Sequence, residues 1–328
     1  MDTAIGVVGA GRLGLGLAQA LALRGNQVVV LTSLAERAAL LSETRACPEV
    51  LPELTELHPL VEVTTDPAAL VARAELVFVT VSRDFFPGLF DRVAPWLTGS
   101  HCVVHAVHRL EGASLERVST RVCSTSAIRQ VAVMAGPADP ADLVEQRLNA
   151  VVVGSAFPAL VRWVREVLAS DVLRISGTSD INGVECAAAL SQVVAVAVGL
   201  SDGLGLGAAS HALVLTRGME EAARVGARLG ARGETFAGLA GVGRVIDGVR
   251  RGDPDYLLGR RFAETGSASL LAEELRYESM GLDVATAVAG ASGVAGLSLP
   301  ILRGIATVAS SGTLDPVSVQ RWLAESVA

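Results

Sequence analysis

The chain has 328 residues, of which 51% are apolar and 19% charged, and this composition excludes a disordered protein. The net charge of -7 is spread along the chain, and all 27 basic residues are arginine. The sequence therefore offers no lysine for Schiff-base chemistry and no basic stripe for a nucleic-acid partner. At roughly 150 residues per domain, the length predicts two domains.

Cysteine spacing and hydropathy indicate the compartment in which the protein is expected. The most apolar stretch, residues 193–200, is too short to cross a bilayer and is expected to be a buried core helix. No cysteine pair has the spacing of a zinc or redox motif, and nothing resembles a signal peptide. We therefore expect a cytoplasmic protein without a membrane partner. The cysteines are Cys47, Cys102, Cys123 and Cys186.

The first thirty residues carry strand, helix and strand patterns in succession. An apolar run over residues 4–8 ends at Gly9, residues 12–24 place apolar side chains at helical spacing, and residues 27–31 form a second apolar run. This order predicts a βαβ unit of a parallel sheet.

Further apolar runs continue the alternation to about residue 153. Because they are Val-rich and continuous, they fit strands of a sheet that is covered on both faces. We expect an α/β Rossmann domain with a doubly wound, mostly parallel sheet. The expected strands are residues 61–64, 76–81, 102–107, 131–135 and 150–153, with helical stretches at 67–72 and around 87–96.

From about residue 180 the pattern becomes helical throughout. We therefore predict a Rossmann domain over residues 1–178 and an all-α domain over residues 179–328. A homodimer would cover part of the apolar surface of this Ala- and Val-rich half. The expected helices are residues 185–200, 208–229, 270–289, 299–309 and 317–324.

A glycine-rich motif follows the first strand and opens the first helix. In this context Gly9 permits a tight turn, Gly11 lets the backbone approach a pyrophosphate, and Gly14 lets helix and strand pack closely. The free N–H groups at the helix start would face the phosphates. The motif predicts an NAD or NADP site, and its residues are Gly9, Ala10, Gly11, Arg12, Leu13 and Gly14.

The second strand ends without the acidic residue that usually binds the ribose hydroxyls of NAD. Thr32 and Ser33 stand there instead, and Arg37 lies nearby. Hydroxyls beside an arginine suit the additional phosphate of NADP, so the prediction favours NADP over NAD. The alternative is that these are capping and surface residues. Val81, at the end of a neighbouring strand, is expected to line the same site.

Several motifs beyond the glycines resemble those of the NAD(P)-dependent glycerol-3-phosphate dehydrogenases over nearly the whole chain. The resemblance implies a nucleotide-binding domain followed by a helical substrate domain. The matching segments are Pro48-Glu49 with Leu51-Pro52, Ala135-Gly136-Pro137, Asp180 to Glu185, Thr216-Arg217-Gly218, Thr235 to Gly243, and Pro300-Ile301.

Positions that carry the chemistry in that family hold different residues here. The family's two active-site lysines correspond to His108 and Ser191, and its Gly-Asp-Leu aspartate to Arg244. Its Ser-Arg-Asn phosphate clamp corresponds to Asp253-Pro254-Asp255, whose carboxylates would repel a phosphate dianion. The resemblance therefore implies a diverged active site and a substrate other than glycerol 3-phosphate.

Four residues are candidates for catalysis in this diverged site. His108 is the first choice as proton donor because it replaces a family lysine at a strand end and an imidazole suits proton transfer near neutral pH, with His105 as the fallback. Ser191 and Gln192 either orient the substrate or only fill the space of the family's lysine and asparagine. Arg244 either binds an acidic group or pairs with a surface carboxylate.

The sequence thus predicts an NAD(P)-dependent oxidoreductase that reduces a carbonyl or imine of a small polar metabolite. The substrate is expected between the two domains, at the carboxyl ends of the strands. The alternative is a pseudoenzyme or non-redox protein that retains the fold, with or without the cofactor, and lacks dehydrogenase turnover.

Overall fold

The computed structural model divides into two compact units. The first comprises the chain up to Val107 together with Val118–Ile181, and the second comprises His108–Arg117 together with Asn182–Ala328. The sequence-predicted boundary at residue 178 differs at the segment 108–117, which packs with the second unit. The structure describes residues 4–82, 84–267, 279–313 and 315–326.

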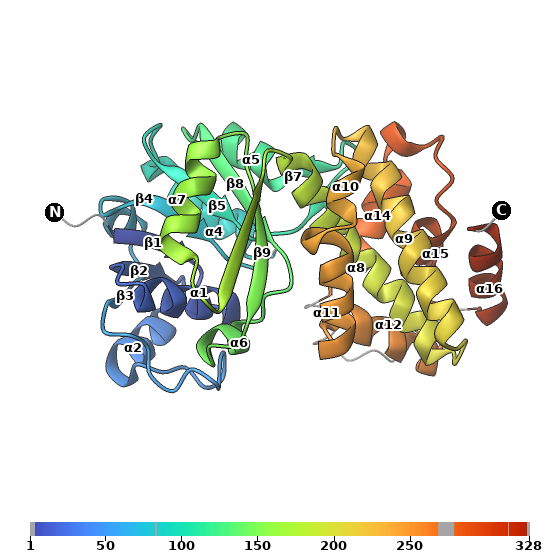
Figure 1. The fold of residues 1–328 in the computed structure, drawn as a ribbon, viewed down its shortest axis with the longest axis horizontal. Helices are drawn as coiled ribbons and strands as arrows, with labels where there is room; N and C mark the ends of the chain where they lie inside the picture. Colours follow the sequence, from blue (N-terminus) through green and yellow to red (C-terminus); the bar gives the residue numbers. More distant parts are fainter. Residues whose placement is uncertain (1–3, 83, 268–278, 314, 327–328) are drawn as a thin grey trace. The chain divides into compact units, whose positions relative to one another are not determined.

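The first unit is built on an eight-stranded sheet in the order β10-β9-β8-β5-β4-β1-β2-β3 (Figure 1). All neighbouring strands are parallel except β8 and β9, which pair antiparallel. The predicted mostly parallel Rossmann sheet is confirmed. The strands are β1 (Ala4–Val8), β2 (Val28–Leu31), β3 (Val61–Thr64), β4 (Ala74–Val79), β5 (Cys102–His105), β8 (Gln130–Ala135), β9 (Asn149–Gly154) and β10 (Leu173–Thr178).

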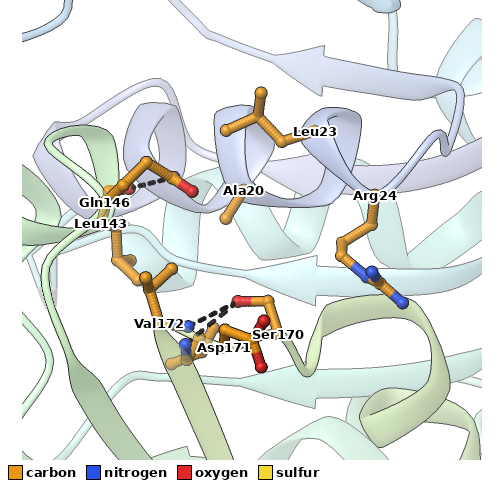
Figure 2. A pocket seen from close by; sticks show the side chains of 9 residues that line it. Ala20, Leu23, Arg24, Leu143, Gln146, Ser170, Asp171 and Val172 are labelled. Atoms are coloured by element: carbon orange, nitrogen blue, oxygen red, sulfur yellow. Dashed lines mark hydrogen bonds between the residues drawn. The ribbon is translucent and has the colours of Figure 1, made fainter.

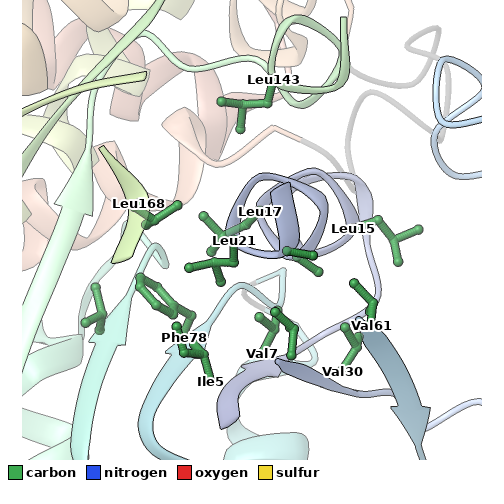
Figure 3. Packing of buried hydrophobic residues seen from close by; sticks show 14 of the residues in the cluster. Ile5, Val7, Leu15, Leu17, Leu21, Val30, Val61, Phe78, Leu143 and Leu168 are labelled. Carbon is green, nitrogen blue, oxygen red and sulfur yellow. The ribbon is translucent and has the colours of Figure 1, made fainter. Parts of the chain in front are cut away.

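Side chains alternate between two cores, one on each face of this sheet. Along β4, Leu76 and Phe78 belong to one core, whereas Val77 and Val79 belong to the other. Figure 3 shows Phe78 on the face that also receives Leu17 and Leu21. This two-sided burial explains why the strands are apolar throughout.

The covering helices were predicted in part. The helix expected at residues 12–24 is observed as α1, and that at 67–72 as α3. The sequence prediction missed several further helices and the edge strand β10. The helices of this unit are α1 (Arg12–Leu23), α2 (Ala35–Thr44), α3 (Pro67–Val71), α4 (Phe86–Val93) with η1 (Ala94–Trp96), α5 (Val118–Thr125), α6 (Pro140–Val144) and α7 (Pro158–Leu168).

The second unit is helical, as predicted, apart from a short hairpin of β6 (Leu110–Glu111) and β7 (Glu116–Arg117). The expected helix over residues 270–289 is observed from Gly281 onward, and its residues up to 278 lie outside the described part of the chain. The helices are α8 (Ile181–Gly203), α9 (Ala208–Arg228), α10 (Gly233–Phe236), η2 (Leu239–Gly243), α11 (Arg244–Arg251), α12 (Pro254–Thr265), α14 (Gly281–Gly290), η4 (Ser292–Val294), α15 (Pro300–Ser311) and α16 (Pro316–Glu325).

Helix α8 forms the centre of the helical unit. A Cβ at Gly259 would lie against the carbonyl oxygen of Val196, and one at Gly281 would lie 2.6 Å from that of Gln192. Glycine at these crossings therefore lets α12 and α14 approach the α8 backbone. Of the helices described, α8 alone is long and apolar enough to cross a membrane, and its most apolar 18-residue window is wholly buried. The core-helix prediction for residues 193–200 is confirmed.

Candidate functional site

Two positions at the junction of β1 and α1 require glycine, one in the loop and one in the first turn of α1. Gly9 has a φ of +114°, and a Cβ there would lie 2.8 Å from Val81 Cγ1. A Cβ at Gly14 would overlap the carbonyl oxygen of Gly9 and lie 2.8 Å from Thr80 Oγ1. The first turn of α1 is therefore packed directly against the end of β1.

Gly11 lies at the open side of this loop. A Cβ there would meet no heavy atom within 4 Å. Helix α1 begins one residue later, and in the described structure no side chain caps it. Its first N–H groups therefore point out of the helix end, where the helix dipole favours an anion. Open space and unpaired N–H groups together fit the pyrophosphate of a dinucleotide.

A pocket of about 200 Å³ extends from this loop across the ends of β1, β2 and β4. Seven of the ten residues predicted to bind the cofactor line it. Gly14 is buried beneath the loop, while Arg12 is exposed and its Nη1 donates to Val50 O at 3.3 Å. The lining consists of Gly9, Ala10, Gly11, Thr32, Ser33, Leu34, Arg37, Thr80, Val81, Ser82, Phe85 and Leu89.

The end of β4 contributes residues that the sequence prediction missed. Thr80 lies 3.2 Å from the carbonyl oxygens of both Val8 and Gly9 and donates its hydroxyl to them. Phe85 lines the pocket with 67% of its surface exposed, so that an apolar ring is available to a ligand. The parallel pairing of β1 with β4 places these residues beside the glycine loop. The apolar run that follows the βαβ unit is the sequence signal from which Thr80 and Phe85 could have been predicted.

The end of β2 presents hydroxyls and a guanidinium to the same pocket. Thr32 is buried, and its Oγ1 accepts the Leu34 N–H at 3.2 Å, which fixes the turn into α2. Ser33 is exposed, and Arg37 Nη1 donates to Ala10 O at 3.4 Å. A neighbouring pocket of about 570 Å³ shares Ser33 and Arg37 and adds Glu36 and Glu49, among others.

A third pocket, of about 260 Å³, lies at the other end of α1 (Figure 2). Its polar groups are partly engaged within it: Gln146 Nε2 donates to Leu143 O, and Ser170 Oγ accepts the N–H groups of Val172 and Leu173. None of the residues that line it was predicted as a site residue. The lining comprises Ala20, Leu23, Arg24, Leu143, Gln146, Ser170, Asp171, Val172 and Leu173.

The helical unit brings two of the four predicted catalytic residues together. Gln192 Nε2 donates to the backbone oxygen of His108 at 3.4 Å. Ser191 is buried, and its hydroxyl donates to Ala188 O within α8 at 2.8 Å. The fallback candidate His105 is fully buried at the end of β5 in the other unit.

Arg244 lies on another helix of this unit. It begins α11 and is half-buried. Among the described residues, no hydrogen bond or ion pair joins its guanidinium to Ser191 or Gln192. A half-buried guanidinium favours an anionic neighbour.

The turn into α12 holds two carboxylates, and both are engaged in capping. Asp253 Oδ1 accepts the Tyr256 N–H at 3.0 Å at the start of α12. Asp255 is fully buried, and its Oδ1 accepts the Ser279 hydroxyl at 2.6 Å and the Met280 and Gly281 N–H groups at 2.8 and 2.7 Å. Burial, and next the charge of Asp253, raise the pKa of Asp255 to about 6.

Both units match models of a single protein family. The model "NAD-dependent glycerol-3-phosphate dehydrogenase N-terminus" matches residues 4–160, and that of the C-terminus matches residues 180–317. The chain belongs to the NAD-dependent glycerol-3-phosphate dehydrogenase family. The predicted resemblance is thereby confirmed.

Individual relatives and solved structures agree with this family. The chain is 30% identical to the glycerol-3-phosphate dehydrogenase (NAD(P)+) of Oleidesulfovibrio alaskensis over 94% of both chains. It is 27% identical to that of Teredinibacter turnerae over 94% of this chain and 91% of the relative. The crystal structure of the Coxiella burnetii enzyme shares the fold with a TM-score of 0.89 at 23% identity, covering 98% of this chain and 99% of that one.

This dehydrogenase-family chain is therefore an NAD(P)-dependent oxidoreductase that acts on a CH-OH group, with NAD or NADP as its cofactor. The residues around Gly11 fit that cofactor, because open space, unpaired helix N–H groups and a glycine backbone meet there. Within the described residues, no cluster of three histidine, cysteine or acidic side chains could hold a metal ion.

Proposed function

We propose that this family member reduces a carbonyl or imine of a small polar metabolite other than the glycerol phosphate named in its relatives. The observation that supports the proposal is the engagement of Asp253 and Asp255, which the sequence resemblance assigns to the positions of the family's phosphate clamp. Both carboxylates cap helices, and Pro254 between them offers no cation. A phosphate dianion would meet negative charge there instead of an arginine.

In this proposal His108 supplies the proton to the developing alkoxide or amine, and a nicotinamide cofactor held at the glycine loop around Gly11 would supply the hydride. An imidazole suits that task because its ordinary pKa lies near neutral pH. Gln192 orients the substrate beside His108, to which it is hydrogen-bonded. Arg244 binds an acidic group of the substrate, since its guanidinium has no ion pair with any residue that the structure describes.

A pseudoenzyme is the second candidate, and the geometry of Ser191 favours it. The sequence resemblance assigns this residue to a lysine position of the family. Its hydroxyl is buried and bonded within its own helix. It neither carries charge nor offers a proton outward. Binding of NAD(P)H without turnover of any carbonyl would support this alternative.

The deciding experiment is a paired titration and turnover assay on the purified chain. NADH and NADPH binding is followed by nicotinamide fluorescence, and oxidation is followed with dihydroxyacetone phosphate and a panel of keto acids, ketones and imines. Turnover of another carbonyl, with little or none of dihydroxyacetone phosphate, is the expected result. Preferred turnover of dihydroxyacetone phosphate would overturn the proposal.

With the substrate that this assay identifies, His108→Ala should lower kcat about 100-fold, the usual scale of a lost general acid. The dissociation constant of NADPH should stay within twofold, because the glycine loop is unaltered. His211→Ala is the matched control, since this half-exposed histidine pairs with Asp202 in the same unit. Equal losses in both variants would remove His108 from its proposed role.

Cofactor preference is proposed to favour NADP through Ser33 and Arg37, which line the pocket together. Arg37→Gln should weaken NADPH binding about 10-fold and NADH binding less than twofold, because only the former carries a phosphate for the guanidinium. Arg24→Gln, an exposed arginine at the far end of α1, is the charge-matched control. If NADH and NADPH weaken equally, Arg37 does not read the phosphate.

The cytoplasm is the proposed site of action. In the described part of the chain none of the four cysteines forms a disulfide, and three of them are buried, which fits a reducing compartment. A homodimer remains a prediction, and the molar mass in solution measured by light scattering would test it.

A further inference from the structure

The hairpin over residues 108–117 leaves the sheet domain in sequence but packs with the helical unit. Its two short strands pair antiparallel, with Leu110 opposite Arg117 and Glu111 opposite Glu116. The proposed proton donor His108 stands at the entry of this hairpin. The position of His108 therefore depends on what fastens the hairpin to the helices.

The first contact that fastens the hairpin to the helices is at its first residue, His108. Gln192 of α8 is almost fully buried, and its Nε2 donates to the backbone oxygen of His108 at 3.4 Å. A bond to the backbone fixes the path of the chain at His108 and leaves the imidazole outside this contact.

The other fastening lies at the exit. Arg117 Nε is 3.5 Å from Glu185 Oε2, and the Glu185 side chain is only 2% exposed. Arg117 Nη1 also donates to Leu229 O at the end of α9, at 3.2 Å. Asn182 donates to the same oxygen at 3.2 Å, so the hairpin, α8 and α9 meet at one point. An ion pair this buried is costly to break on one side, because the remaining charge loses its partner.

The two fastenings share one face of α8. Glu185 and Gln192 are seven residues apart, which is two helical turns and about 10 Å along the axis. We propose that this face clamps both ends of the hairpin, so that Glu185 is a positioning residue that holds His108 through Arg117. This inference rests on the proposed role of His108 and deepens it.

Hydrogen exchange and kinetics of Glu185→Gln test the clamp on the full chain. The amides of residues 108–117 should exchange at least 10-fold faster, because the exit of the hairpin is released. With the substrate found in the turnover assay, kcat should fall about 10-fold and KM less than twofold. Glu185→Asp keeps the charge and should recover most of both effects.

Glu220→Gln is the matched control, since it removes the same charge from the exposed Arg217–Glu220 pair of α9. It should leave exchange in residues 108–117 and kcat unchanged. NADPH affinity serves as the check that each variant is folded. If Glu185→Gln does not fold, Arg117→Lys carries the test, because it keeps the cation and loses the reach to Leu229.

Unchanged exchange in residues 108–117 would overturn the clamp, and faster exchange with unchanged kcat would overturn the positioning role. Failure of the proposed function is distinguishable from both. If His108→Ala retains full turnover, His108 is not the proton donor and Glu185 positions nothing catalytic. The exchange result would still decide whether the hairpin is clamped.

Discussion

Replacing Gly11 with alanine should weaken NADH and NADPH binding roughly 100-fold, about 2.7 kcal/mol, while the fold keeps its stability. The protein leaves open space around this position, so the added methyl group meets no protein atom within 4 Å. The backbone at Gly11, with φ of -85°, also suits alanine. The methyl group would occupy the space through which a pyrophosphate approaches the backbone. Fluorescence titration measures the affinity, and thermal unfolding measures the stability.

Two further glycines control this experiment. Gly14→Ala should lower the melting temperature, because its methyl group would overlap the Gly9 carbonyl oxygen. Gly233→Ala, at another open position, should change neither property. Unimpaired NADPH binding by Gly11→Ala would show that the cofactor does not approach this loop, and the assignment of the pocket would fail.

The nucleotide-binding half was largely predictable because its signals are local. Alternating apolar runs and the glycine motif lie within thirty residues and have few other structural solutions. The polar helix α2 and the edge strand β10 were missed because neither carries a continuous apolar run. Strand β10 is exposed over much of its length, so its sequence does not show the continuous apolar run of a buried strand.

Most of the pocket was predictable from the glycine motif and from the ends of the expected strands, but Thr80 and Phe85 were not. Gly9 and Gly11 belong to a recognisable sequence motif. Thr80 and Phe85 come to lie beside them only because β4 pairs with β1. That pairing joins segments about seventy residues apart. A single sequence does not specify such a partner, since several apolar runs could have taken the place of β4.

In the helical unit, too, contacts between segments far apart in the sequence could not be predicted. The sequence places Asp253 and Asp255 close together and predicts only that they repel a phosphate. In the structure Asp255 accepts hydrogen bonds at the start of α14, from residues that lie 24 to 26 positions further along the chain. Likewise, nothing in the sequence links Arg117 to Glu185 across 68 positions. Buried polar contacts between distant segments decide the local role of such residues.

Asp255→Asn should stabilise the helical unit at neutral pH. The folded-state pKa of about 6 lies above the ordinary value of 3.8, mainly through burial and then through the charge of Asp253. A raised pKa means that the stability from the protonated acid is complete below pH 4 and is lost as the pH rises through 6. Two pKa units correspond to roughly 3 kcal/mol. Asparagine keeps the Oδ1 acceptor for all three donors and has no charge to desolvate.

Urea denaturation between pH 4.5 and 8 measures this effect. Trp322 packs against Gly304 in the helical unit, so its fluorescence reports the unfolding of that unit. The other two tryptophans, Trp96 and Trp163, are replaced by phenylalanine in every protein compared. The free energy of unfolding of Asp255→Asn relative to Asp255 should rise by about 2 kcal/mol between pH 4.5 and 7.5. Asp171→Asn, at a fully exposed carboxylate, should give a difference that is independent of pH. A flat difference for Asp255→Asn as well would mean that Asp255 is ionised without cost, and that its burial at the start of α14 is compensated by its three donors.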